Sequence, residues 1–255
     1  MDPVDVTVVG VERLLPLFKP DTPNRALLYS VLEGQNRAVV VVDDAENPCS
    51  CLLRTSVFGF TFYATQDPAF LSEAISVLRQ IGDLVMIASQ AGADVEPPAN
   101  VDKRIKRLEF LDRDVLGSVQ PSVPSGCEFM PITSELLERC EWGDEFNDTC
   151  NAPAAFYDRS PGICLMRGDD ILCEAYAAWW GNRIVEIGVV TPVRHRRMGY
   201  GASTCEHLAR SCESLGCATT WTCDEDNAGS MAIARKLGFR TERPYEQLVY
   251  RQHND

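Results

Sequence analysis

The sequence has no uninterrupted apolar run long enough to cross a bilayer, for which about 20 residues are needed. Its N-terminus is acidic, MDPVDVTVVG, and lacks the basic stretch with which a secretory signal begins. With 45% hydrophobic and 24% charged residues over 255 positions, the composition is that of a soluble globular protein of one large or two ordinary domains. We therefore expect a cytoplasmic protein without a membrane partner.

Basic residues are also scarce. The net charge of −13 is shared almost evenly by the two halves, so neither half carries the basic face that nucleic acid would require. We expect no nucleic-acid partner. A cationic or amine substrate would suit this field better, although an acidic surface also serves solubility alone.

The eleven cysteines lack the spacing of a metal site or a redox motif. No CxxC pair is present, and no histidine stands at zinc-ligand spacing from a cysteine. Cys205 and Cys212 fall on the apolar face of an expected helix, where a free thiol behaves as a small hydrophobe. We expect reduced structural thiols and no metal.

The first half has the pattern of a mixed α/β unit. Short apolar runs bounded by turn residues predict strands at 37–44, 49–57, 60–65 and 83–89. Helical spacing predicts helices near 24–34 and over 68–82. The apolar face of the second helix is expected to consist of Phe70, Ile75, Leu78 and Ile81.

The second half repeats this mixture. Strands are predicted on both sides of the turn at 167–170, and at 183–190, 217–223 and 247–252. Thr133 and Asn227 are expected to cap helices, and Gly216 and Gly238 to end them. One of these helices should present an apolar stripe of Cys205, Leu208, Ala209, Cys212 and Leu215.

Glycine, serine and proline punctuate the stretch GSVQPSVPSG in the manner of a linker. We predict an N-terminal domain over 1–116, a linker over 117–125 and a C-terminal domain over 126–255. The similar element order of the two halves suggests a duplicated architecture.

Two close glycines stand before a helix pattern in RRMGYGAS, at 196–203. The P-loop pattern GxxxxGK[ST] is absent, and a dinucleotide fingerprint would need glycine or alanine where Thr204 stands. What remains is R-x-x-G-x-G/A, matched by Arg196, Gly199 and Gly201. At such a helix start, unpaired backbone N–H groups and the helix dipole attract a pyrophosphate, unless the segment is only a glycine-rich turn.

A second motif follows, N-x-x-S-x-x-x-x-x-K-L-G-F, which begins at Asn227 and includes Ser230. With both motifs, residues 126–250 resemble the GNAT superfamily of acyl-CoA-dependent N-acyltransferases, and more narrowly the subgroup that contains zwittermicin A resistance proteins. The resemblance implies an α/β fold (an α+β mixed sheet), with the GNAT fold in the C-terminal half and a GNAT-like companion half that lacks the pyrophosphate loop.

The resemblance also implies acetyl-CoA, or another acyl-CoA, as co-substrate. The loop amides would hold the pyrophosphate, and the end of the preceding strand would pair with pantetheine. Asn227 would touch the pantetheine arm, cap its helix, or do both. The implied acyl-CoA residues are Val189, Val190, Thr191, Arg196, Arg197, Met198, Gly199, Tyr200, Gly201, Ala202, Asn227 and Ser230.

Acyl transfer to an amine needs a general base, because the amine attacks in its neutral form. Glu186 is the first candidate, since a carboxylate inside an apolar strand is costly unless it is paired or its pKa is raised. A salt-bridged or edge-facing glutamate is the alternative interpretation, and Asp224 is the alternative base. Ala234 stands where many GNAT enzymes carry a tyrosine acid, so the acid is in doubt; Tyr176 is one possible acid.

The acceptor pocket is assigned to Trp142, Glu145 and Trp179, an aromatic and acidic set suited to a cationic amine, although a solvated acidic helix has the same composition. We predict an N-acetyltransferase that acts on a primary amine of a small molecule, such as an antibiotic or a biosynthetic intermediate, as a monomer or homodimer. The alternatives are a non-catalytic acyl-CoA-binding or scaffold protein, and an acetyltransferase that acts on a protein amine.

Overall fold

The computed structural model describes residues 1–82, 84–89, 95–115, 123–143 and 162–252. The chain divides into two compact units, Met1–Arg107 with Pro244–Asp255, and Leu108–Arg243. The first unit therefore contains the C-terminal end of the chain, which the predicted boundaries, 1–116 and 126–255, do not provide for. Most of the predicted linker, 117–125, lies outside the described residues.

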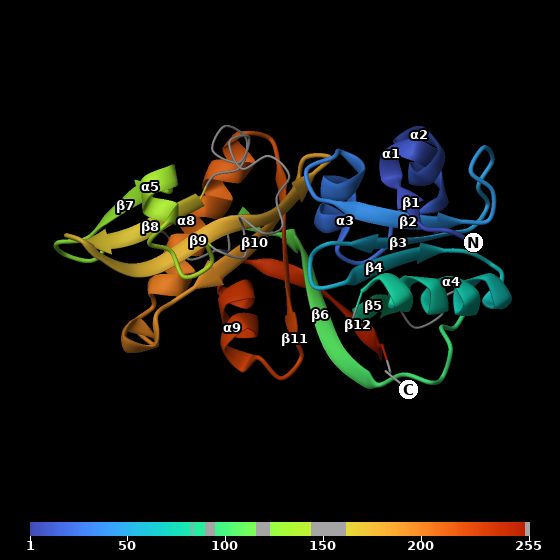
Figure 1. Cartoon of the computed structure of the whole chain (residues 1–255). Coiled ribbons are helices and arrows are strands. Elements are labelled where there is room, and N and C mark those ends of the chain that lie inside the picture. The colour runs from blue at the N-terminus through green and yellow to red at the C-terminus, as the bar shows by residue number, and fades with distance from the viewer. Residues whose placement is uncertain (83, 90–94, 116–122, 144–161, 253–255) are drawn as a thin grey trace. The chain divides into compact units, whose positions relative to one another are not determined.

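The first unit is a sheet with helices on both faces (Figure 1). Its strands lie in the order β1-β2-β3-β4-β5-β12. The elements are β1 (Val4–Asp5), α1 (Val6–Val9), α2 (Val11–Leu14), η1 (Leu15–Leu17), α3 (Arg25–Leu32), β2 (Ala38–Val42), β3 (Cys51–Thr55), β4 (Phe60–Ala64), α4 (Pro68–Ile81), β5 (Leu84–Ser89), and parts of β6 (Lys103–Arg113) and β12 (Phe239–Arg251).

Backbone pairing brings the end of the chain into this unit. β12 runs antiparallel to β5, from the pair Glu246 and Ser89 to the pair Arg251 and Leu84. Leu248 and Tyr250 of β12 are buried in the same apolar cluster as α4. A strand that completes both the hydrogen bonding and the core of the sheet belongs to that unit, however far away it lies in the sequence.

The second unit has the order β6-β11-β10-β9-β8-β7, with the first residues of β12 beside β6. Its further elements are β7 (Glu128–Pro131), α5 (Ser134–Leu137), β8 (Gly162–Arg167), β9 (Asp170–Gly181), β10 (Ile184–Val190), η3 (Val193–His195), α8 (Tyr200–Ser214), β11 (Ala218–Asp224) and α9 (Ala228–Lys236). The predicted caps are confirmed: Thr133 Oγ1 accepts from the Leu136 amide and Asn227 Oδ1 from the Ser230 amide. Gly216 and Gly238, past the ends of α8 and α9, have positive φ angles.

Most predicted elements lie where the sequence places them, but the elements β1, α1, α2, η1, β6, β7 and η3 were not predicted, and two predicted apolar positions are exposed. The long strand β6 was not predicted, because its sequence, KRIKRLEFLDR, is mostly charged and only residues 108–110 are buried. Ile81 and Leu215 are 50% and 63% exposed, so the predicted apolar faces are wrong at these two positions. Both residues stand at helix ends, where the helix no longer covers the sheet.

The sheet of the second unit carries a different core on each face. On one face α8 packs Cys205, Leu208, Ala209 and Cys212 against side chains that include Val185 and Ile187 of β10. On the other face, residues of α5 and of the segment after it pack on β8 and β9. Glu186 lies between Val185 and Ile187 in the strand, so its side chain is on the face opposite α8.

Each unit contains a helical crossover between two parallel strands, β4-α4-β5 and β10-α8-β11. The repeated arrangement supports the duplicated architecture. The two helix starts differ. The carboxylate of Asp67 accepts from the Ala69 amide and Pro68 opens α4, whereas Gly199 opens α8 and no side chain caps it.

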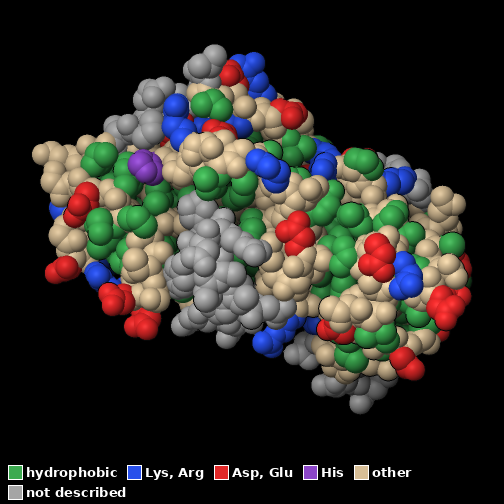
Figure 2. Space-filling model, turned by 90° about the horizontal axis from the view of Figure 1, so that it is seen from above, with side chains coloured by type: hydrophobic (Ala, Val, Ile, Leu, Met, Phe, Trp, Pro, Cys, Tyr) green, Lys and Arg blue, Asp and Glu red, His purple; other side chains and the backbone are tan. Residues whose placement is uncertain are grey.

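The described surface and thiols agree with the composition. Figure 2 shows acidic side chains scattered over the face that it presents. Among the described residues, no helix is long and apolar enough to span a membrane. The ten described cysteines are free thiols, most of them buried. Burial raises the pKa of Cys51 and of Cys212 to about 12, as expected of structural thiols.

Candidate functional site

The loop between β10 and α8 ends in a helix start that is open to an anion. Gly199, the N-cap, has a φ of +82°, a left-handed conformation that glycine adopts without strain. Arg197 is also left-handed, with a φ of +66°. Because no side chain caps the helix, the first-turn amides and the positive end of the helix dipole can bind a phosphate.

Gly201 is favoured in the motif for a different reason, which is the packing around it. A Cβ atom at this position would lie 3.1 Å from Cδ1 of Ile233 and 3.5 Å from Oγ1 of Thr191. The first turn of α8 therefore packs closely on the end of β10 and on α9, and a methyl group at Gly201 would need Ile233 to shift by a few tenths of an ångström. Of the two glycines in the motif, Gly199 is favoured by its backbone conformation and Gly201 by close packing.

Side chains hold this loop in place. Arg196 Nε donates to the carbonyl oxygen of Thr191 at 3.0 Å. The buried Tyr200 accepts a hydrogen bond from Arg167 at 3.4 Å. Arg194 binds Asp170 at 2.6 Å, and this hydrogen bond lowers the pKa of the Asp170 carboxyl. The turn between β8 and β9 thus anchors the loop from two sides.

β10 has a strand edge next to this loop. Its parallel pairing with β11 runs from Ile184 to Glu186. From Ile187 to Val190, the described pairing is with β9 alone. The backbone of β10 that leads toward α8 can therefore accept an extended ligand as an added strand.

Glu186 lies where the pairing of β10 and β11 ends, and it is 8% exposed. Thr222 of β11 donates its hydroxyl hydrogen to Glu186 Oε1 at 2.6 Å. Across the sheet Glu186 pairs with Trp179, whereas Ile187 pairs with Ala177, so Ala178 is the extra residue of a bulge. Such a bulge redirects the neighbouring side chains.

Aromatic side chains lie on the same face as Glu186. The rings of Trp142 and Tyr176 are stacked, 3.9 Å apart and 16° from parallel. Tyr176 pairs with Gly188, and a Cβ at Gly188 would lie 2.3 Å from the Tyr176 ring. Trp179 follows as the cross-strand partner of Glu186. The Glu186 carboxylate thus lies beside Trp142, Tyr176 and Trp179, which we call the aromatic wall. Glu186 stands on β10, the strand that leads to the anion site at the start of α8.

A family model for GNAT acetyltransferases matches residues 16–248. The chain belongs to the GNAT acetyltransferase family. Its mixed α/β sheet is the GNAT fold over the whole chain, and the family implies acyltransferase activity. The finer resemblance to zwittermicin A resistance proteins is not part of this match.

Similar proteins agree with the family. An uncharacterized N-acetyltransferase of Bacillus subtilis, YdfB, is 25% identical over 100 residues, which are 39% of this chain and 38% of that protein. A GCN5-related N-acetyltransferase-like protein from Streptococcus suis is 19% identical, covers 93% of this chain and 98% of its own, and has a TM-score of 0.68. A tandem GNAT protein from the clavulanic acid biosynthesis pathway is 12% identical, covers 100% and 98%, and has a TM-score of 0.60. The two structures show a shared fold.

Within this GNAT acetyltransferase, several predicted residues lie together and others do not. Glu186, Tyr176, Trp142 and Trp179 share one face of the sheet. Asp224 stands four residues beyond Thr220, which pairs with Glu186. Four residues span about 13 Å along a strand, so Asp224 is far from the Glu186 carboxylate. The predicted substrate residue Glu145 lies outside the described residues.

Residues of the second GNAT motif stabilise α9 and the core beside it. Asn227 caps α9, and the Ser230 hydroxyl accepts from the indole N–H of the buried Trp221 at 2.9 Å. Ala234 is fully buried in the core with α8, where the larger side chain of a tyrosine would overpack. Met198, in the loop, is exposed.

Thr222 was missed in the sequence analysis, although a signal for it exists. In the strand ATTWTCD, Trp221 is buried, so the alternating residues Thr220 and Thr222 lie on the opposite face. β11 is the parallel neighbour of β10, and that face is the one that carries Glu186. Alternation combined with strand order would have found this hydroxyl.

Proposed function

We propose that this protein transfers an acetyl group from acetyl-CoA to a primary amine of a small molecule. The observation that carries the proposal is the path on β10 from Glu186, at the end of its pairing with β11, along a strand edge to the uncapped start of α8. This path combines a base, a docking strand and an anion site in one line.

The residues present fit acetyl-CoA. The amides of Arg197 to Ala202 would hold the pyrophosphate, because Gly199 has a left-handed conformation and no side chain caps the helix. Val189, Val190 and Thr191 would hold the pantetheine arm through their backbone, together with Asn227 and Ser230 at the start of α9. Acetyl-CoA supplies the thioester that is broken. The side chains of Arg196 and Tyr200 keep the loop in shape.

Glu186 acts as the general base. It takes the proton of the attacking amine directly or through a water molecule, and the Thr222 hydroxyl fixes the orientation of its carboxylate. Tyr176, whose ring lies over Gly188, is the proposed donor of the proton that the leaving thiolate needs. Because a thiolate is a tolerable leaving group, this second transfer is the less demanding one.

The acceptor is a cationic amine. The half-buried Trp179 provides aromatic surface that attracts an ammonium group, and the net charge of −13 favours its approach. Trp142 is 5% exposed and supports this face from behind by stacking on Tyr176. An aminated antibiotic or a biosynthetic intermediate fits this chemistry, which is also what the resemblance to zwittermicin A resistance proteins suggests.

The test is release of free CoA thiol from acetyl-CoA with spermidine, tyramine, kanamycin and a lysine peptide as acceptors. We expect turnover with at least one small amine. Glu186→Gln should lower kcat by about 100-fold or more and leave the KM for acetyl-CoA unchanged. Asp224→Asn, the matched change at the alternative base, should retain activity.

The outcomes separate the alternatives. Turnover of the peptide alone would favour a protein acceptor. Binding of acetyl-CoA without turnover of any amine would favour a non-catalytic acyl-CoA-binding protein. If Asp224→Asn lost activity and Glu186→Gln did not, the base would be Asp224.

A further inference from the structure

Glu174 is a buried carboxylate that the proposed reaction does not use. It lies on β9, is 1% exposed, and pairs across the sheet with Cys164 and Val190, which both belong to the apolar cluster beneath α5. Its Oε1 accepts a hydrogen bond from the Glu141 amide at 2.8 Å. Within the described residues, its equally buried Oε2 has no hydrogen-bond partner.

A carboxylate in such a place is costly. Burial raises the pKa of Glu174, and hydrogen bonds from the amides of Glu141 and Trp142 oppose that rise. An apolar residue would fill the same space without this cost. What an apolar residue could not do is accept hydrogen bonds from two successive backbone amides.

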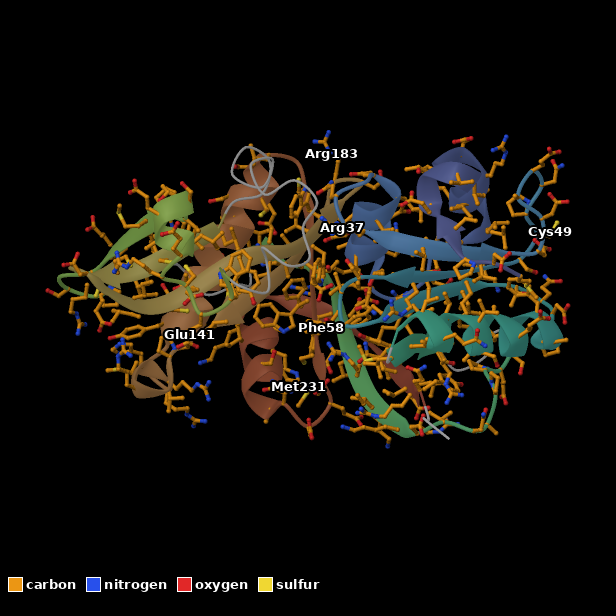
Figure 3. All side chains as sticks on the ribbon, in the orientation of Figure 1. Arg37, Cys49, Phe58, Glu141, Arg183 and Met231 are labelled. Carbon is orange, nitrogen blue, oxygen red and sulfur yellow. The ribbon has the colours of Figure 1, made fainter. Side chains whose placement is uncertain are left out.

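Those two amides belong to the segment that leads to the aromatic wall. After α5, backbone hydrogen bonds form two further turns: the Cys140 amide donates to the carbonyl of Leu137, and the Gly143 amide donates to the carbonyl of Cys140. Glu141, labelled in Figure 3, lies inside the second of these turns. The next residue is Trp142, which stacks on Tyr176. Glu174 thus binds the backbone directly beside Trp142.

The register ties this contact to the site. Glu174 and Tyr176 stand on the same face of β9, two residues apart. Tyr176 pairs with Gly188, two residues from Glu186 on β10. β9 therefore contacts this segment twice. Its Glu174 binds the backbone next to Trp142, and its Tyr176 stacks on the Trp142 indole.

We propose that Glu174 is a positioning residue of the aromatic wall. It holds the amides of Glu141 and Trp142 and thereby fixes the indole of Trp142 against Tyr176. The role in acceptor binding rests on the proposed function. The role in the Trp142–Tyr176 stack is independent of it.

The experiment is a double-mutant cycle of Glu174→Met and Trp142→Phe, read by near-UV circular dichroism. The stacked pair should give a signal that Trp142→Phe removes. Glu174→Met should remove most of that signal, and the double variant should show little further change. Ile171→Ala is the matched control: it truncates a buried residue of the same strand and cluster, so it should lower Tm and keep the signal.

The kinetic arm uses the amine that the wild type turns over fastest. Glu174→Met should raise the KM for the amine roughly tenfold, the size expected for losing a buried charge-assisted hydrogen bond, with the KM for acetyl-CoA nearly unchanged. Glu174→Gln keeps one oxygen acceptor and should restore most of the amine affinity. If no amine is turned over, this arm falls with the proposed function, whereas the circular dichroism still decides the role of Glu174.

Two results would overturn the proposal. One is a normal near-UV signal in a folded Glu174→Met variant, with folding checked by Tm and acetyl-CoA binding. The other needs no variant: in the wild-type protein, hydrogen exchange at the amides of Glu141 and Trp142 should be slow, and exchange at the rate of an unprotected chain would show that Glu174 does not hold them.

Discussion

At the scale of single residues, Glu186 depends on a hydroxyl from the neighbouring strand. Thr222 donates to one of its carboxylate oxygens at 2.6 Å, in a place where Glu186 is almost fully buried. A hydrogen bond to a buried carboxylate favours its ionised form, and the proposed base must also keep its orientation. The Thr222 hydroxyl is placed to serve both needs.

We therefore expect Thr222→Val to impair catalysis while the fold survives. Loss of one hydrogen bond to a charged group should lower kcat roughly tenfold and move the acid limb of the kcat profile to higher pH, because the carboxylate loses a group that stabilises its ionised form. Thr220→Val is the control, since among the described residues the Thr220 hydroxyl makes one long hydrogen bond, 3.4 Å, to the carbonyl of Val185. Equal pH profiles in the two variants would contradict this role.

At the scale of elements, the start of α8 differs from the start of α4. Asp67 fills the N-terminus of α4 with its own carboxylate, so that helix carries its own anion. α8 has the left-handed Gly199 instead, and a Cβ there would meet no described atom within 4 Å. This difference supports the proposal of a pyrophosphate site at the second crossover and not at the first.

Gly199→Ala should therefore have two separable effects. The left-handed backbone should cost about 1 kcal/mol of unfolding free energy, and the new methyl group should weaken acetyl-CoA binding measured by calorimetry. Gly34→Ala is a matched control, because Gly34 has a φ of +74° and equally open space. It should show the stability loss alone. An unchanged acetyl-CoA affinity in Gly199→Ala would argue against this anion site.

At the scale of the whole molecule, residues far apart in the sequence hold the second unit together. The side chain of Arg113 at the end of β6 is 2% exposed and forms ion pairs with Glu206 and Glu213 of α8. Its Nε also donates to the carbonyl of Leu237, beyond α9, at 2.7 Å. One guanidinium thus joins an unpredicted strand to both helices that flank the proposed acyl-CoA site.

Removing Arg113 from these ion pairs should lower the free energy of unfolding. Arg113→Met removes one of the two arginines that pair with the buried Glu206 and leaves Arg210, so it should cost about 2–3 kcal/mol in urea unfolding. The double change Arg113→Met with Glu206→Leu removes both charges and should be less destabilising than Arg113→Met alone. A double variant as unstable as the sum of the single changes would show that the two charges are not coupled.

Local patterns were sufficient for much of the fold. Glycine spacing located the loop before α8, and the caps at Thr133 and Asn227 marked helix starts, because each depends on neighbours a few residues away. β6 was not predictable in this way, since charged residues outnumber its buried ones. Among the proposed site residues, Glu186 was proposed from its isolation in an apolar strand, whereas Thr222 and Glu174 required knowledge of strand order and of the faces.

The sequence by itself determined the family motifs, the order of most elements and the absence of metal and membrane signatures, because these depend on composition and short-range spacing. Only the tertiary structure decided that the last strand joins the first unit, that Gly201 packs closely on Ile233, and that Glu174 binds the segment of Trp142. Each of these rests on contacts between residues distant in the chain, and no local pattern encodes which distant residue fills a given space.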